Sequence, residues 1–307
     1  MKKFYLVLFG AMLTVTAFAQ QGKNGLVLDS TYVTSGNGER QSKSIIEYNA
    51  NKQMTAQYDY SYFDDNFTFV NPPILEEKMV VDYDAQGQMA KLSGYAYDNG
   101  EEYLYFTQEY SDYDKATDIP KTILLKYLID DENPSLGLED YLKVVVNKIG
   151  TNGVEDETTS VYYMGQWIEY YSAHYDYNAD GTLAKETDLG YVTDVTTYEY
   201  DENKEVSKKT VVSADQLGRP VTTVTTYAYE YYSDGNMKKM TATKNNNSSM
   251  EYYFWGDGKA KGGDAAGIEL ARKQMEMVQR IYDLNGRSVQ NPKKGLYIMN
   301  GKKVFIK

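Results

Sequence analysis

A short turn pattern recurs along most of this chain and constrains its fold more than any other feature. In each clear copy a Tyr is followed by Asp or Asn, two further residues, a turn residue, one more residue and an aliphatic side chain. Clear copies begin at Tyr48, Tyr83, Tyr177 and Tyr200, and looser copies begin at Tyr113 and Tyr231. A unit repeated in this way predicts a repetitive fold.

The centres of the copies have the chemistry of tight turns. They are Asn51-Lys52, Gln86-Gly87, Asp180-Gly181, Asn203-Lys204 and Asp234-Gly235. Such pairs favour a two-residue type I′ turn, in which both central residues need positive φ, so each copy predicts a β-hairpin. We expect the Asp or Asn after each Tyr to accept hydrogen bonds from backbone amides at the turn.

One copy also has the spacing that opens a calcium-binding loop. Asp176, Asn178 and Asp180 occupy alternate positions, and Gly181 follows them. A calcium loop of this kind needs a bidentate acid at its twelfth position, which is Thr187 here. A hairpin explains the other copies as well, so we expect a turn at this point and no metal site.

The segments between the turns have the two-residue period of β-strands. In 58–62, 171–177 and 227–231 the tyrosines fall on alternate residues, with polar or small residues between them. We therefore predict an all-β fold: an antiparallel meander of repeated hairpins over 20–257, elongated or curled into an open barrel. Most tyrosines should pack the sheet, and a few at an exposed end could bind a ligand. The segment 135–150 is predicted as a short helix or a buried strand.

The N-terminus has the features of an export signal. Lys2 and Lys3 precede an apolar stretch, and Ala17-Phe18-Ala19 fits a signal peptidase site, so 1–19 is predicted to be a signal peptide. No later run is long and apolar enough to predict a membrane span. The chain has no cysteine, which excludes disulfides, thiol catalysis and a lipidated cysteine. These features suit a protein of the bacterial envelope.

Charge divides the chain into an acidic body and a basic tail. Residues 20–258 hold 19 Lys/Arg and 40 Asp/Glu, a net charge of −21, whereas 259–307 have a net charge of +7. The acidic body argues against nucleic acid as a partner. The sign changes within a Gly/Ala/Lys-rich stretch, so 258–275 is predicted to be a linker and 276–307 a small β module.

Candidate catalytic groups are few. His174 is the only histidine, and Ser172 and Asp176 would share its strand face. Side chains two apart on a strand run parallel, so we predict an exposed histidine and not a triad. The acidic runs 101–102, 130–132 and 155–157 fall in predicted loops, where acids are usually solvated. We therefore predict no enzyme, no cofactor and no metal site.

The units "YDAQGQMAK", "YNADGTLAK" and "YDENKEVSK" resemble the YD repeats of bacterial surface and toxin proteins. They are also similar to the hairpin units of exported β-rich proteins of unknown function. The resemblance implies a β-hairpin scaffold, often at the cell surface, and no common chemistry.

The tail resembles the C-terminal sorting domain of type IX secretion. The matching residues are Tyr282, Asp283, Gly286, Arg287, Gly295, Tyr297 and the closing Lys307. Leu296–Met299 and Lys302–Ile306 should form a hairpin with Tyr297 opposite Val304. The resemblance implies recognition by an outer-membrane translocon, and the alternative is a hairpin that only caps the sheet. The helix-favouring run 268–280 departs from the strands of that family.

The sequence thus favours an exported scaffold or binding protein at the cell surface or outside the cell. Its partners would be the secretion translocon, through the tail, and a glycan or a surface protein. Two alternatives stay open. One is a secreted hydrolase that uses a pair of carboxylates, and the other is a periplasmic envelope factor.

Overall fold

The structure is a computed structural model that describes residues 22–64, 67–98, 101–128, 137–215 and 217–257, and short strands between 281 and 306. The chain divides into two compact units, Met1–Lys259 and Ala260–Lys307, which are described separately. The predicted signal peptide and the predicted linker lie outside the described residues.

Within the described part of the first unit, 16 strands each pair antiparallel with their neighbours. In chain order they are β1 (Val27–Ser35), β2 (Arg40–Tyr48), β3 (Met54–Phe63), β4 (Phe69–Tyr83), β5 (Met89–Asp98), β6 (Glu101–Ser111), β7 (Thr122–Tyr127), β8 (Glu139–Ile149), β9 (Val154–Tyr163), β10 (Gln166–Tyr177), β11 (Leu183–Leu189), β12 (Thr193–Tyr200), β13 (Val206–Ala214), β14 (Pro220–Tyr231), β15 (Met237–Lys244) and β16 (Asn247–Gly256). A 3-10 helix, η3 (Lys23–Gly25), precedes β1.

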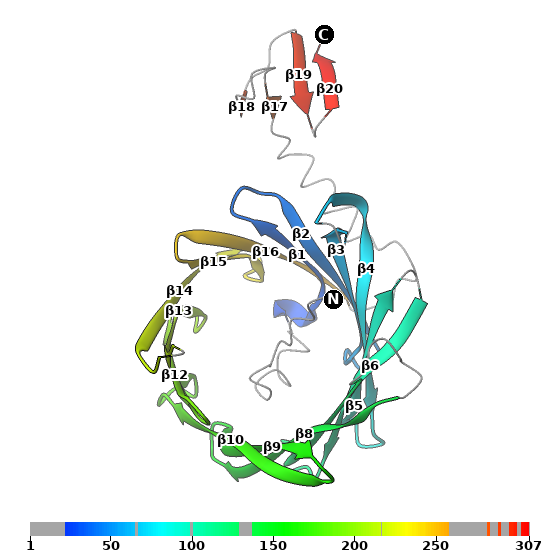
Figure 1. Cartoon of the computed structure of the whole chain (residues 1–307). Coiled ribbons are helices and arrows are strands. Elements are labelled where there is room, and N and C mark those ends of the chain that lie inside the picture. Colours follow the sequence, from blue (N-terminus) through cyan, green and yellow to red (C-terminus); the bar gives the residue numbers. More distant parts are fainter. Residues whose placement is uncertain are drawn as a thin grey trace. The chain divides into compact units, whose positions relative to one another are not determined.

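The meander closes into a barrel. Each strand lies beside the next, and β1 pairs with β16 as well as with β2, which places Tyr32 opposite Tyr252 (Figure 1). The predicted all-β antiparallel meander is confirmed, but the predicted elongated and open forms are wrong. Closure depends on pairing between the two ends of the repeat region, and no local pattern encodes that pairing. It removes the unpaired edges that an open sheet would present.

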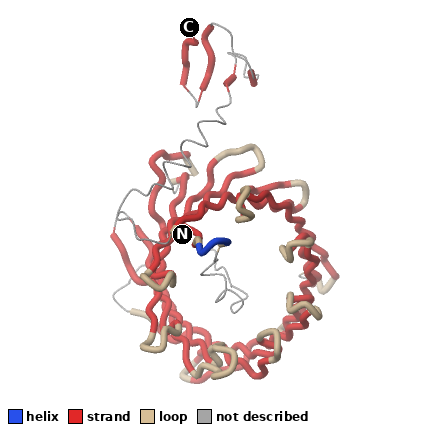
Figure 2. The backbone as a smooth tube through the Cα atoms, turned by 180° about the vertical axis from the view of Figure 1, so that it is seen from behind, coloured by secondary structure: helices blue, strands red, loops and turns tan. Residues whose placement is uncertain are grey.

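The predicted hairpins are confirmed, although the predicted turn type is wrong. After β2, Lys52 N–H donates to Asn49 C=O at 3.0 Å, and Asn49 N–H donates to Gln53 C=O at 2.9 Å. Within this turn Lys52 has positive φ, 60°, and Asn51 does not. The connection is therefore a type I turn followed by a left-handed residue in a G1 bulge. Gly87, Gly181, Lys204 and Gly235 occupy the same left-handed position in their turns. These turns bend into the ring of strands (Figure 2), and we call this end of the barrel the turn rim.

The residue after the Tyr has the predicted role in the copies at Tyr48, Tyr83 and Tyr200, whereas in the copy at Tyr177 it is Asp180, not Asn178, that accepts the backbone N–H of Thr182. Asp84 Oδ1 accepts hydrogen bonds from the backbone N–H groups of Gln86 at 2.9 Å and Gln88 at 2.8 Å. Asn49 and Asp201 accept equivalent pairs in their own turns. These bonds occupy turn amides that the strand ladder leaves unpaired.

Burial identifies the inner face of the barrel. Along β14, Thr223, Thr225, Tyr227 and Tyr229 are half-buried, and the residues that alternate with them are exposed. Side chains on the concave face of a closed sheet converge, and those on the convex face spread apart. The half-buried set therefore faces the interior. Directly opposite residues on paired strands share a face, so the registers carry this assignment around the barrel.

Part of the inner face is apolar. Val27 and Met54 are 0% and 1% exposed, and Val81 and Leu92 are paired across β4 and β5. With them cluster the buried residues Tyr48, Met89, Tyr110, Ile123, Val144 and Val146. Several of these flank the repeat turns, so the core lies near the turn rim and supports it.

The segment predicted as a helix or a buried strand is a strand. β8 covers Glu139–Ile149, and Val144 and Val146 are 5% and 6% exposed. The strand preference of the β-branched valines outweighed the helical spacing of the apolar residues, because alternate valines pack on the inner face. No helix in the described residues has both the length and the hydropathy to cross a bilayer.

The second unit contains a small antiparallel sheet. Its strands are β17 (Ile281–Tyr282), β18 (Ser288–Val289), β19 (Gly295–Met299) and β20 (Lys302–Ile306), in the order β18-β17-β19-β20. β19 and β20 form the predicted hairpin with Tyr297 opposite Val304. The run 268–280 lies outside the described residues.

Candidate functional site

Aromatic side chains join neighbouring hairpins at the turn rim. Tyr83, at the end of β4, donates its hydroxyl to the carbonyl of Met54, the first residue of β3, at 2.8 Å. Equivalent bonds of 2.5–2.9 Å run from Tyr48 to Leu28, Tyr113 to Met89, Tyr177 to Val154, Tyr200 to Leu183, Tyr229 to Val206, and the Trp255 indole to Met237. In five of the copies the repeated Tyr is therefore structural, since its hydroxyl holds the adjacent hairpin, and in the copy at Tyr231 this role passes to Tyr229.

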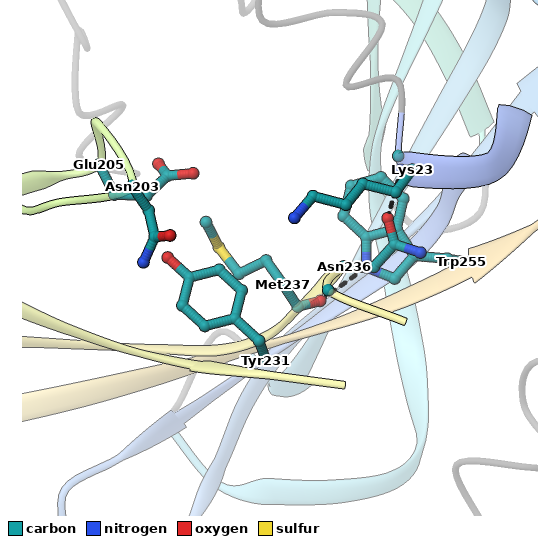
Figure 3. A pocket seen from close by; sticks show the side chains of 9 residues that line it. Lys23, Asn203, Glu205, Tyr231, Asn236, Met237 and Trp255 are labelled. Carbon is teal, nitrogen blue, oxygen red and sulfur yellow. Dashed lines mark hydrogen bonds between the residues drawn. The ribbon is translucent and has the colours of Figure 1, made fainter. Parts of the chain in front are cut away.

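A pocket of about 410 Å³ lies at this rim between two turns and the N-terminal segment. Figure 3 shows its labelled side chains gathered from the β12–β13 and β14–β15 turns, from β14, β15 and β16, and from η3. Its lining consists of Gly22, Lys23, Asn203, Glu205, Tyr231, Gly235, Asn236, Met237 and Trp255. We call it the rim pocket.

The N-terminal segment forms one wall of the rim pocket. The backbone N–H of Lys23 donates to Asn236 Oδ1 at 2.5 Å, across 213 positions of sequence. Asn236 is 3% exposed, and its turn is fixed by Asp234. A Cβ placed on Gly22 would lie 2.6 Å from the Trp255 ring, so Gly22 permits close packing against the indole. The pocket therefore exists only when residues before β1 are in place.

The opposite wall offers polar groups. Burial raises the pKa of the Tyr231 hydroxyl, and a hydrogen bond with the Asn203 side chain acts in the opposite direction. Burial, with the charge of Asp201 nearby, raises the pKa of Glu205 above its ordinary value. Asn203 lies beside Tyr231 (Figure 3). A buried hydroxyl next to an amide and a carboxyl offers both donors and acceptors to a ligand.

The lining of the rim pocket offers groups for binding. Among its described lining residues, Glu205 is the single carboxyl and no histidine is present. A two-carboxylate hydrolase needs a second acid across the cleft. Two aromatic rings with convergent amides instead describe a site for an amphipathic or hydroxyl-rich ligand.

His174 lies on the outer face of β10 and is partly exposed, as predicted, but its ring contacts two carboxylates. Its Nδ1 lies 2.6 Å from Asp156 Oδ1 and its Nε2 lies 3.2 Å from Asp176 Oδ1, with 44% of the side chain exposed. The predicted parallel arrangement with Asp176 is wrong, because the imidazole turns along the strand to meet a carboxylate on each side. The hydrogen bond to Asp156 raises the pKa of His174. The group is a charge cluster on the outer face; Ser172 takes no recorded part in it.

The acidic runs predicted as loops also differ. Residues 155–157 lie within β9, and Glu157 is 2% exposed. Residues 101–102 begin β6, where Glu102 accepts a hydrogen bond from Tyr97 and pairs with Lys78 at 3.2 Å. Residues 130–132 lie outside the described part. A strand made of acids and threonines cannot be distinguished from a loop by its sequence. The sequence therefore did not predict the burial of Glu157.

The predicted sorting residues fall partly within the described strands. Tyr282 lies in β17, and Gly295 and Tyr297 lie in β19. Asp283, Gly286, Arg287 and Lys307 lie outside the described residues. Their predicted recognition by a translocon stays a prediction.

The rim opposite the turn rim exposes aromatic side chains. Tyr163, Tyr170 and Tyr191 are 56%, 59% and 101% exposed, and all lie at or near the β9–β10 and β11–β12 connections. Most other tyrosines are buried or half-buried. The expectation that most tyrosines pack the sheet therefore agrees with their burial, and a minority gathers at one end.

Comparisons with known proteins give distant similarities. No protein-family model matches the chain, and no curated protein matches it. A porin-like protein from Bacteroides uniformis ATCC 8492 is 12% identical, with a TM-score of 0.39, over 75% of this chain and 98% of that one. A porin-like protein from Bacteroides vulgatus ATCC 8482 is 11% identical, with a TM-score of 0.34, over the same shares. A protein of unknown function from Bacteroides fragilis NCTC 9343 is 14% identical, with a TM-score of 0.33, over 43% of this chain and 91% of that one. The function proposed below rests on this chain's own residues.

Proposed function

We propose that this chain is an exported, non-catalytic binding protein of the bacterial envelope or cell surface that takes a carbohydrate ligand in the rim pocket. The observation that carries the proposal is the composition of that pocket: the rings of Tyr231 and Trp255 with Asn203, Asn236 and Glu205 around them. Aromatic rings cover the apolar faces of sugars, and amide and carboxyl groups pair with sugar hydroxyls.

The charged outer face of the barrel supports a location in water and not in a lipid bilayer. Cross-strand ion pairs lie on this face, among them Lys126–Glu109 at 3.4 Å and Lys208–Glu199 at 2.7 Å. A Lys on the lipid-facing side of a transmembrane barrel costs about 2–4 kcal/mol at the bilayer midplane. Several such residues on neighbouring strands would oppose insertion, so the proposal places the barrel beside a membrane or outside the cell.

Delivery is the second part of the proposal. The predicted signal peptide would export the chain, and the C-terminal unit would be recognised by a type IX translocon through Tyr282, Gly295, Tyr297 and the neighbouring sorting residues. Fractionation of cells that express full-length protein and protein lacking 276–307 tests this step. The proposal expects surface or medium for the first and periplasm for the second. Equal periplasmic location of both would support an envelope factor instead.

Ligand binding is tested on a glycan array, followed by calorimetry with the best glycan. Tyr231→Phe keeps the ring and removes a single hydroxyl, and Asn203→Ala alters an exposed turn side chain, so both variants should fold. We expect each to weaken binding about fivefold or more, the value of one hydrogen bond. Tyr191→Phe, at the opposite rim, is the control and should bind normally. No glycan bound above background, or equal affinity in all variants, would reject the pocket as the site.

A further inference from the structure

Neighbouring strands place carboxylates in one row on the inner face, away from the rim pocket. Glu157 in β9 lies opposite Ala173 in β10, Ala173 lies opposite Asp188 in β11, and Asp188 lies opposite Asp194 in β12. Opposed residues have Cβ atoms about 4.5–5.5 Å apart. The small Ala173 therefore leaves no large side chain between Glu157 and Asp188. Glu186, two residues from Asp188, faces the same way.

Glu157 supplies an observation independent of the row's charge. It is 2% exposed, and its Oε1 accepts a hydrogen bond from the Tyr175 hydroxyl at 2.9 Å. Its Oε2 is buried and has no hydrogen-bond partner among the described residues. A buried carboxylate oxygen without a donor is costly, and native structures rarely keep one without a reason.

The surroundings increase that cost. Burial, with the charges of Glu186 and Asp188, raises the pKa of Glu157 to about 7. Burial and the charges of Glu186 and Asp194 raise the pKa of Asp188 to about 6. The positive charge of Lys209 acts in the opposite direction and lowers it. One lysine faces several acids here, so the row has a deficit of positive charge.

A bound metal ion does not account for the deficit of positive charge in the row. No three acidic or histidine side chains among the described residues are grouped closely enough to hold a metal ion. An organic cation suits the row better than a metal ion does. Its ammonium or guanidinium group has several N–H donors, and the molecule is longer than a single metal ion. The rings of Tyr175 and Tyr198 flank the acids, and Tyr198 already donates its hydroxyl to Glu186 at 3.1 Å. Aromatic rings beside carboxylates are a favourable setting for organic cations.

We propose that the inner face of β9–β12 binds an organic cation, whose ammonium or guanidinium group donates to Glu157 Oε2 and is held between Asp188 and Glu186. Glu186 and Asp188 are half-buried and meet the ligand first. Glu157, on β9 and separated from Asp188 by Ala173, provides the buried acceptor. This site is separate from the rim pocket, and the proposal stands whether or not the chain binds carbohydrate.

Calorimetry with spermidine and agmatine tests the site on the full-length mature protein at pH 8. Spermidine probes alkylammonium and agmatine probes guanidinium chemistry, and 1,4-butanediol is the uncharged control. We expect saturable binding of at least one cation, weakened tenfold or more by Glu157→Gln and by Asp188→Asn. The matched control is Glu199→Gln on the outer face, which should bind as the wild type does.

The groups that face the ligand also set a pH dependence. The facing groups are Glu157, Glu186, Asp188, Asp194, Tyr175, Tyr198 and Lys209. Glu157 and Asp188, whose pKa values are raised, must ionise, so affinity should fall several-fold between pH 8 and pH 5.5. Absence of binding at pH 8 would overturn the proposal. So would wild-type affinity in Glu157→Gln, or an equal loss in Glu199→Gln, which would indicate unspecific attraction to an acidic protein.

Discussion

Replacing Glu157 with Gln should stabilise the barrel at neutral pH. The carboxyl has a pKa of about 7 in the folded protein against an ordinary value of 4.5, chiefly because it is buried. A carboxyl whose pKa is raised by folding binds more protons in the folded than in the unfolded chain between these values. The free energy of unfolding therefore falls as pH rises from about 4.5 to 7.

The magnitude follows from the two pKa values. A difference of about 2.5 units corresponds to roughly 3 kcal/mol, at about 1.4 kcal/mol per unit. Glu157 is 2% exposed, so solvent screening does not reduce this figure appreciably. Gln keeps the acceptor for the Tyr175 hydroxyl and cannot ionise, and its amide can donate toward the acids beside it.

Urea unfolding followed by tyrosine and tryptophan fluorescence measures the effect at pH 4 and pH 8. At pH 8 we expect Glu157→Gln to be about 3 kcal/mol more stable than the wild type, and at pH 4 the two should differ by less than about 1 kcal/mol. Glu169→Gln, at an exposed position, should change neither value. A variant less stable than the wild type at pH 8 would refute the reasoning, because it would mean that ionised Glu157 is well compensated in the fold.

Three further substitutions test the repeat architecture by the same unfolding assay. Tyr177→Phe removes the 2.9 Å bond to the Val154 carbonyl and should cost about 1 kcal/mol, whereas Tyr191→Phe, fully exposed, should cost nothing measurable. Met54→Ala, at a site 1% exposed, should cost about 2–5 kcal/mol, and a loss below 1 kcal/mol would mean that the core near the turn rim collapses to fill the space. Gly181→Ala forces a side chain onto a residue with φ of 88° and should cost about 1–2 kcal/mol; an unchanged midpoint would contradict the assigned turn geometry.

The repeat predicted the fold class because its signals are local. Tyr on alternate residues and Asp or Asn beside a turn residue act within a few positions, so the strands and the hairpins followed from them. The turn type was wrong because Asp180-Gly181 suits either a type I′ turn or a type I turn with a G1 bulge. The register decides between these two, since Tyr177 pairs with Leu183 and leaves five residues between them.

The sites could not be predicted because they depend on long-range pairing. The rim pocket joins Lys23 to Asn236 across almost the whole repeat region, and nothing near either residue indicates the other. The acidic row needs the register of four strands, and Glu157 reached the interior because β9 places it opposite Ala173. His174 is exposed on its strand as predicted, and only its contact with Asp176 was missed, because a flexible ring rotates toward its neighbours even when the Cα–Cβ bonds are parallel.

The aromatic links at the turn rim have a consequence for how such a molecule can change in size. Each hairpin has its own turn and its own Tyr hydroxyl, and each hydroxyl bonds only to the adjacent hairpin. Duplication or loss of one unit would leave every local contact intact and alter the circumference alone, because barrel diameter follows strand number. The architecture therefore permits barrels of different diameters built from different numbers of the same hairpin unit.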